Sequence, residues 1–231
     1  MLSQKNSLHI VRLTIVAVVA LGFAQIAHAV PVTNFSFEVP ALPDNDFTFP
    51  GVSGWTTPGN QWGTWNPGGF YTGDPGSGTP SGGHGSQISF SNFLQTGTMS
   101  QSPTTILANT TYSLTTAVGI YNNDTGSGIT IELRATSPSV GPILATTTIP
   151  DTSLPNGSLS DFAISFNSAS FGSEVGNPLF IVYTHTAGGN MSIDNVRLDA
   201  VTAEAVPEPS TFVLAVLGLA GMGLVAWRRR K

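Results

Sequence analysis

The sequence contains no cysteine, few charged residues and almost no cations outside its two ends. Without cysteine the protein can form neither a disulfide framework nor a thiolate metal site, and it has no cysteine nucleophile. Residues 30–206 keep only Arg134 and Arg197 against twelve carboxylates, which leaves a formal charge of −10. Because nucleic-acid binding depends on lysine and arginine contacts to phosphates, this charge argues against nucleic acid as a partner.

The sequence also lacks the motifs of serine hydrolases, zinc proteases and nucleotide-binding proteins. Residues 30–206 contain two histidines, His84 and His185, and no lysine. Glycoside hydrolysis needs two carboxyl groups that face one sugar, and no sequence pattern pairs them here. We therefore expect a domain that is not an enzyme, with a glycan-active hydrolase as the less favoured alternative.

Residues 1–29 have the pattern of a signal peptide. Lys5 and Arg12 precede an apolar run at 13–24, and Ala27 and Ala29 form an A-x-A cleavage motif. The 12 apolar residues would cover only about 18 Å of a hydrocarbon core about 30 Å thick, which is too little for a transmembrane helix. We predict that the protein is exported and that its mature chain begins at Val30.

A second hydrophobic segment, residues 211–227, is uncharged and is followed by a basic tail at residues 228–231. Its 17 residues lie at the lower limit for a transmembrane helix. Because basic flanks stay in the cytoplasm, we predict a membrane anchor with residues 228–231 inside and the preceding chain outside. Residues 201–210, rich in Ala, Glu and Pro, are the predicted linker.

Residues 30–200 show the alternation of apolar and polar side chains that is typical of β-strands. Turn-forming residues separate the candidate strands, and neither helical periodicity nor a repeat of fixed length is found. We predict one all-β domain, an antiparallel β-sandwich. The candidate strands are residues 34–39, 87–90, 112–120, 129–133, 143–149, 162–166, 179–184 and 191–198.

Residues 51–85 interrupt this pattern with many glycines and prolines and five aromatic side chains. Long irregular loops are usually functional or disordered, and the aromatic content argues against disorder. Since aromatic rings stack on the apolar faces of pyranose rings, Trp62, Trp65 and Tyr71 are the candidates for exposed carbohydrate contacts. Packing of the loop is the alternative for each of them, and we expect Trp55 to be a core residue.

Pro207, Glu208 and Pro209 stand directly before the C-terminal hydrophobic segment. The two prolines favour an extended backbone, which would present Glu208 beside the membrane. This order of triad, hydrophobic segment and basic tail resembles the PEP-CTERM sorting signal. The resemblance implies an exported protein of a Gram-negative-type bacterium, and it makes exosortase, an integral-membrane processing enzyme, a partner that acts on the tail.

Four elements of the central domain resemble those of galactose-binding-like jelly rolls, which include carbohydrate-binding modules. They are TNFSFEVP at 33–40, SGWT at 53–56, the MSQ and NTTYSLTTAVG elements within 99–119, and SIDNVRL at 192–198. In that superfamily the opening and closing strands lie near one another and often hold a structural calcium ion. The resemblance therefore makes Glu38 and Asp194 candidate calcium ligands. The alternative is that the two motifs serve only to pair the strands and bind no calcium.

Asp44 and Asp46 form a further acidic pair, D-x-D, near this element. The rest of a D-x-D-x-D-G calcium loop does not follow, so we expect a solvated acidic loop. Together these features predict an exported cell-surface or extracellular-matrix protein that associates with exopolysaccharide through a non-catalytic β-sandwich. The alternative is a structural coat or matrix component without a discrete ligand.

Overall fold

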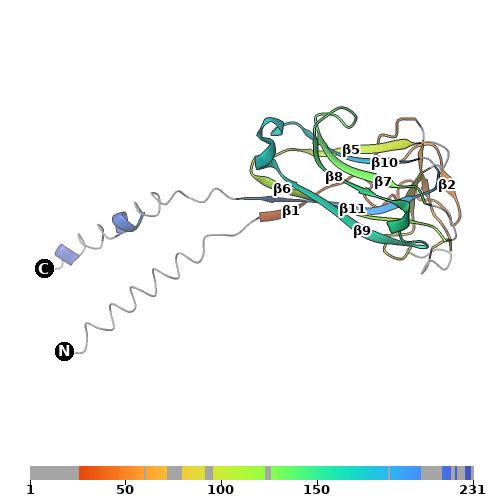
Figure 1. Ribbon diagram of the computed structural model, residues 1–231. Helices are drawn as coiled ribbons and strands as arrows, with labels where there is room; N and C mark the ends of the chain where they lie inside the picture. The colour runs from red at the N-terminus through yellow and green to blue at the C-terminus, as the bar shows by residue number, and fades with distance from the viewer. Residues whose placement is uncertain are drawn as a thin grey trace. The chain divides into compact units, whose positions relative to one another are not determined.

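The computed structural model describes residues 26–59, 61–71, 80–91, 96–122, 126–186, 188–203, 215–219, 222 and 227–229. Residues 27–202 form one compact unit, and the remaining N- and C-terminal residues form another. The first unit consists of two β-sheets packed face to face (Figure 1).

The larger sheet has seven strands in the order β2-β3-β4-β11-β6-β9, and β1 also pairs with β11. They are β1 (Ile26–Val30), β2 (Phe47–Thr48), β3 (Trp62–Trp65), β4 (Ile88–Ser91), β6 (Thr110–Ile120), β9 (Ser158–Asn167) and β11 (Ser192–Thr202). The smaller sheet has the order β5-β10-β7-β8, formed by β5 (Gly97–Thr105), β7 (Ile129–Ala135), β8 (Ile143–Ile149) and β10 (Pro178–His185). Two 3-10 helices, η1 (Asp151–Ser153) and η2 (Ser168–Glu174), lie in the connections.

The core between the sheets is built from alternate residues of the strands. Leu114 of β6, Ile131 of β7, Tyr183 of β10 and Leu198 of β11 are all at most 1% exposed and belong to one cluster. Burying a side chain of this size stabilises a fold by roughly 1.5–3 kcal/mol. Every strand pair whose register is defined is antiparallel, so the predicted all-β antiparallel sandwich is confirmed.

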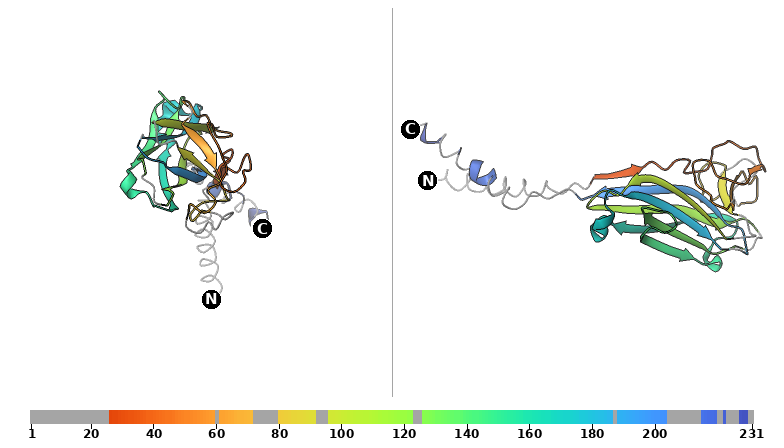
Figure 2. Two further views of the ribbon diagram at one scale, coloured as in Figure 1. Left: turned by 90° about the vertical axis from the view of Figure 1, so that its right-hand side faces the viewer. Right: turned by 90° about the horizontal axis from the view of Figure 1, so that it is seen from above.

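The sandwich has two distinct ends. Strand β1 and the last residues of β11 lie at one end, where Thr202 pairs with Thr110 at the start of β6. Strand β2 lies at the other end, as the view from above in Figure 2 also shows. The chain therefore leaves the sandwich at Thr202, far from β2.

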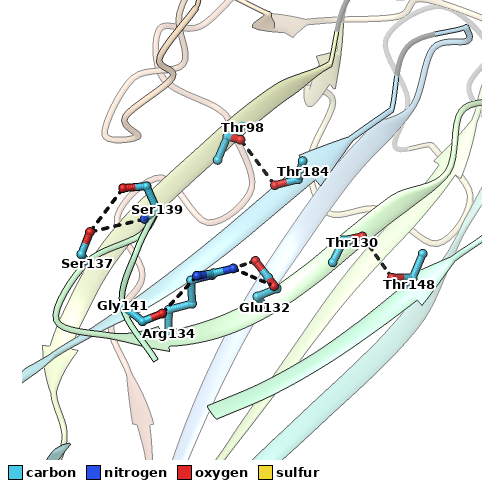
Figure 3. Close-up of polar contacts among 9 residues, drawn as sticks. All are labelled: Thr98, Thr130, Glu132, Arg134, Ser137, Ser139, Gly141, Thr148 and Thr184. Carbon is cyan, nitrogen blue, oxygen red and sulfur yellow. Dashed lines mark hydrogen bonds and ion pairs between the residues drawn. The ribbon is translucent and has the colours of Figure 1, made fainter. Parts of the chain in front are cut away.

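The outward face of the smaller sheet carries a row of threonines. The strand register places Thr98 opposite Thr184, Thr184 opposite Thr130, and Thr130 opposite Thr148. One row thus crosses all four strands (Figure 3). The Oγ1 atoms of Thr98 and Thr184 are 3.4 Å apart, and those of Thr130 and Thr148 are 3.1 Å apart, so the hydroxyls pair with each other.

Residues 34–39 were expected to form a strand, and this prediction is wrong. The backbone has positive φ angles at Asn34 (49°) and Phe37 (58°), and the Phe37 N–H donates to the carbonyl of Asn34 in a turn. The expected irregular loop at 51–85 contains a regular strand, β3. Strand β5 was not predicted because its sequence, GTMSQSPTT, has too few apolar residues to show alternation.

The predicted terminal segments fall mainly outside the described residues. Strand β1 covers the predicted cleavage motif at 27–29, and residues 1–25 of the predicted signal peptide are not described. Of the predicted anchor, residues 215–219, 222 and 227 are described, as helix. Among the residues that the structure describes, no helix is long and apolar enough to cross a bilayer.

Candidate functional site

A cleft lined mainly by aromatic rings lies where β2, β3 and β4 pair at the edge of the larger sheet. Its volume is about 510 Å³, within the usual range for ligand sites. We call it the aromatic cleft. The residues that line it are Asn45, Phe47, Phe49, Trp65, Phe70, Phe90, Tyr121 and Asn190.

Trp65 is the central ring of the cleft. Its centroid lies 5.2 Å from that of Phe70, 5.6 Å from Tyr121 and 6.3 Å from Phe90, and all three pairs are tilted or edge-to-face. Phe90 also makes an edge contact with Phe47, at 6.1 Å. Aromatic pairs prefer these arrangements, so the rings support one another and form a continuous apolar lining.

The register of three short strands places these rings on one face. Phe47 pairs with Trp65, and Gly63, two residues before Trp65 on β3, pairs with Phe90. A Cβ atom at Gly63 would lie 2.7 Å from Phe90 Cε1 and 2.4 Å from the carbonyl oxygen of Thr48. Glycine at this position therefore lets the Phe90 ring lie across β3 and form part of the cleft.

Two buried amides hold the chain that forms one wall of the cleft. The Gln87 side chain, 1% exposed, donates to the carbonyls of Phe37 (2.6 Å) and Pro40 (2.9 Å) and accepts from the Leu42 N–H. The Asn66 side chain donates to the Leu42 carbonyl at 2.9 Å. The segment that leads to Asn45 and Phe47 is thus fixed from inside the domain.

Three phenylalanines of the cleft remain accessible to solvent. Phe47 is 59% exposed, Phe49 is 38% exposed and Phe70 is 46% exposed. Single exposed apolar residues are ordinary, but three of them around one hollow mark an interaction site.

The structure places only one of the three predicted sugar contacts, Trp65, in the cleft. Trp62 projects from the opposite face of β3 and is fully buried against the ring of His185, with centroids 5.3 Å apart. Tyr71 is 2% exposed and belongs to a small second core cluster against which Trp65 packs. The expectation of exposed rings at Trp62 and Tyr71 is therefore wrong, whereas Trp55 is a core residue as predicted.

Several cleft residues were missed from the sequence. Phe47 and Phe49 alternate in the short segment FTFP, a signal for a strand edge that could have been noticed. Phe90 and Tyr121 belong to or directly follow predicted strands, and nothing in the sequence shows that they meet Trp65. Their proximity depends on the pairing of segments far apart in the chain.

Glu38 and Asp194, the candidate calcium ligands, are held by one glycine-containing loop. Glu38 Oε1 accepts from the N–H groups of Ser86 (2.9 Å) and Gln87 (2.8 Å). Asp194 Oδ2 accepts from the His84 N–H at 2.5 Å. Residues 84–87 therefore connect the two carboxylates, and we call this pair with its loop the acidic site.

Burial controls the ionisation of Asp194, which is fully buried. Burial raises the pKa of the Asp194 carboxyl to about 8, and the N–H bonds from His84 and Asn195 lower this pKa, while the nearby charge of Glu38 raises it. A bound cation would reverse this effect, because it favours the ionised form.

Oxygen donors of this kind fit a hard cation such as calcium. Two glycines let the loop backbone approach, since a Cβ at Gly83 would lie 2.7 Å from Asp194 Oδ2 and one at Gly85 would lie 2.2 Å from Glu38 Oε1. The part of the chain that the structure describes contains no group of three or more Asp, Glu or His side chains arranged for a metal. Backbone carbonyls and water would have to complete the coordination of six to eight oxygens.

The family of the domain follows from its sequence. A model of the HpiC1-like family, described as HpiC1 cyclase, matches residues 28–199. The chain belongs to the HpiC1-like family. The PEP-CTERM protein-sorting motif matches residues 205–231, which confirms the predicted sorting signal with Pro207, Glu208 and Pro209. These three residues lie outside the described part of the structure.

Solved structures share the fold of the HpiC1-like domain. An apo cyclase from Fischerella sp. aligns with a TM-score of 0.63 and 22% identity, over 78% of this chain and 98% of that one. The Stig cyclase Fisc from Fischerella sp. TAU, in complex with (3Z)-3-(1-methyl-2-pyrrolidinylidene)-3H-indole, aligns with a TM-score of 0.63 and 20% identity, over 78% and 100%. The carbohydrate-binding module TmCBM61 with β-1,4-galactotriose matches more weakly, with a TM-score of 0.46 and 13% identity, over 74% and 97%, and this match does not show a shared fold. No curated protein is similar to the chain in sequence.

Membership of the HpiC1-like family conflicts with the expectation of a domain that is not an enzyme, because the family model describes a cyclase. At 22% identity or less, the likeness to the Fischerella cyclases shows a shared fold. The activity of this HpiC1-like domain therefore has to be argued from its own cleft.

Proposed function

We propose that this protein is sorted to the cell surface through its PEP-CTERM signal and binds extracellular polysaccharide in the aromatic cleft. The sorting motif supports the export and the processing by exosortase. The observation that carries the binding proposal is the group of three exposed phenylalanines around Trp65 in one cleft.

The chemistry of the cleft suits a sugar ring. Aromatic faces pack against the C–H face of a pyranose, and the amides of Asn45 and Asn190 supply donors and acceptors for hydroxyl groups. The described lining residues include no carboxylate or imidazole, whereas glycoside hydrolysis needs two carboxyl groups at one sugar. Binding is therefore the function that these side chains support best.

The test is a glycan panel, including the native exopolysaccharide, measured with the exported domain and two variants. We expect Trp65→Ala to weaken binding by roughly tenfold or more, a change that corresponds to about 1.4 kcal/mol. Phe35→Ala serves as the control, because Phe35 is 37% exposed and does not line the cleft. Absence of saturable binding to any glycan would leave the structural coat as the better account.

A cyclase is the second candidate, and family membership favours it. The test is binding of (3Z)-3-(1-methyl-2-pyrrolidinylidene)-3H-indole, which occupies the related Fisc cyclase, together with product analysis after incubation with indole substrates. Turnover that Trp65→Ala abolishes would favour the cyclase. Glycan binding without turnover would favour the binding role.

We further propose that the acidic site holds one structural calcium ion through Glu38 and Asp194. The supporting observations are the hydrogen bonds that both carboxylates accept from one loop and the raised pKa of Asp194. Calcium should then raise the unfolding temperature of the wild-type domain in a concentration-dependent way. Asp194→Asn should remove that response, and an equal response in both proteins would contradict the site.

A further inference from the structure

Two aspartates adjoin residues that line the aromatic cleft. Asp46 lies between the lining residues Asn45 and Phe47, and its Oδ1 accepts the Phe47 N–H at 2.9 Å. Asp44 precedes Asn45, and both aspartates are exposed. Both aspartates of the D-x-D pair therefore belong to the segment that contributes Asn45 and Phe47 to the cleft.

A third aspartate is linked to the cleft through a β-bridge. Asn190, another lining residue, forms this bridge with Gly126. A Cβ atom at Gly126 would lie 3.6 Å from the Cβ of Asp151, which is exposed. Asp151 is therefore separated from a lining residue by one glycine, and its charge adds to the field around the cleft.

No lysine or arginine is available to balance these charges. The domain has two arginines, and each already binds a carboxylate elsewhere: Arg134 binds Glu132 at 2.9 Å, and Arg197 binds Asp161 at 2.6 Å. The described residues that line the cleft are six aromatic residues and two asparagines. The cleft therefore combines aromatic faces with a negative surrounding field.

We propose that the aromatic cleft selects a positively charged polysaccharide, a chain of amino sugars with free ammonium groups. This inference rests on the proposed glycan binding and names the class of glycan. The pyranose ring would stack on Trp65, and the ammonium group would lie against the neighbouring ring faces and near Asp46. Cations are attracted to the faces of Trp, Tyr and Phe, and this attraction is strongest where water is excluded.

The same charges exclude other glycans. A polysaccharide of uronic acids would be repelled by a domain with a formal charge of −10 and by Asp44 and Asp46. An N-acetylated chain keeps the stacking surface but lacks the cation, so it should bind less tightly. The cleft thus discriminates among sugars by charge more than by shape.

The experiment compares three oligosaccharides of equal length by isothermal titration calorimetry, using the exported domain. The probes are glucosamine, N-acetylglucosamine and galacturonate oligomers. We expect the glucosamine oligomer to bind about tenfold more tightly than its acetylated counterpart, and we expect the galacturonate oligomer not to bind. Raising the salt from 0.01 M to 1 M, which shortens the Debye length from about 30 Å to about 3 Å, should reduce this preference.

Two substitutions with a matched control locate the effect. Asp44→Asn combined with Asp46→Asn should lower the affinity for the glucosamine oligomer about three- to tenfold and leave that for the acetylated oligomer unchanged. The amide introduced by Asp46→Asn keeps an oxygen that can accept the Phe47 N–H, so the loop should retain its structure. Asp199→Asn removes an exposed charge on β11 that does not line the cleft, and it should change neither affinity.

The outcomes separate this inference from the proposed function. Equal binding of the glucosamine and acetylated oligomers, both lost in Trp65→Ala, would overturn the charge selection and keep glycan binding. Tighter binding of the galacturonate oligomer would also overturn it. Failure of all glycans to bind would overturn both proposals. A preference for glucosamine that the Asp44 and Asp46 substitutions abolish would support both.

Discussion

The two sheets of the sandwich differ in whether the side chains on their outward faces find partners within the domain. On the smaller sheet, threonine hydroxyls pair across the strands, and Arg134 donates two hydrogen bonds to Glu132, at 2.9 and 3.1 Å (Figure 3). A third Arg134 bond, to the Gly141 carbonyl, completes the group. Polar side chains on this face therefore form hydrogen bonds with one another.

The outward side of the larger sheet has neither feature: its rings stay exposed, and its buried carboxyl has no arginine partner. It leaves phenylalanine rings exposed around the aromatic cleft, and it buries Asp194 near Glu38, while the two arginines of the described domain pair with other carboxylates. Exposed rings do not gain the stabilisation that burial would give, and a buried carboxyl without a cation costs stability. The comparison therefore places both candidate ligand sites on the larger sheet.

The largest effect should come from Asp194. Because burial raises its pKa from the ordinary value of 3.8 to about 8, the folded state binds more protons than the unfolded state between about pH 4 and pH 8. In calcium-free buffer the free energy of unfolding should therefore fall as the pH rises, by up to about 1.4 kcal/mol per pH unit. Urea unfolding at several pH values measures this slope, and Asp194→Asn should flatten it.

Gly63→Ala should have the next largest effect, because the new Cβ would meet the Thr48 backbone and the Phe90 ring. We expect a loss of roughly 1–3 kcal/mol in the free energy of unfolding, together with weaker glycan binding. Gly172→Ala is the control, since a Cβ at Gly172 has nothing within 4 Å. Similar stabilities of the two variants would show that β2 can shift without cost.

Arg134→Met tests the completed face of the smaller sheet. It leaves Glu132, which is 8% exposed, without its cation, and we expect a loss of about 1–3 kcal/mol in the free energy of unfolding. Arg197→Met breaks the more exposed pair with Asp161, where the side chains are 41% and 52% exposed, and should cost less than about 1 kcal/mol. Urea unfolding of both variants shows which substitution lowers the free energy of unfolding more. Neither substitution should change the affinity for glycans.

Thr130→Ala should have the smallest effect. It removes one hydroxyl pair from the threonine row, and cross-strand pairs contribute roughly 0.2–1 kcal/mol. Unfolding in urea and titration with the glucosamine oligomer should both give values close to those of the wild type. A marked loss of binding would show that the smaller sheet also has a ligand site.

The strands with clear alternation were predictable because one of their faces is buried. The predicted segments at 143–149, 112–120 and 179–184 correspond closely to β8, β6 and β10. Residues 34–39 were mispredicted, since their apolar residues alternate although positive φ angles at Asn34 and Phe37 form a turn.

The candidate site was only partly predictable. The loop composition pointed to Trp65, but it could not show that Trp62, three residues earlier on β3, faces the core. Phe90 reaches the cleft through strand pairing, and this long-range register is not visible in local sequence. A family resemblance named Glu38 and Asp194 together, and calcium binding by them stays a prediction. The loop at 84–87 that bonds to both carboxylates gave no signal of its own.

The position of the chain exit has a consequence for access to ligands. Strand β11 ends at Thr202, five residues before Pro207, a distance of at most about 18 Å even for an extended backbone. Strand β2, which contributes Phe47 to the aromatic cleft, lies at the opposite end of the sandwich (Figure 1). The end of the sandwich that carries the aromatic cleft is therefore not the end at which the chain leaves it.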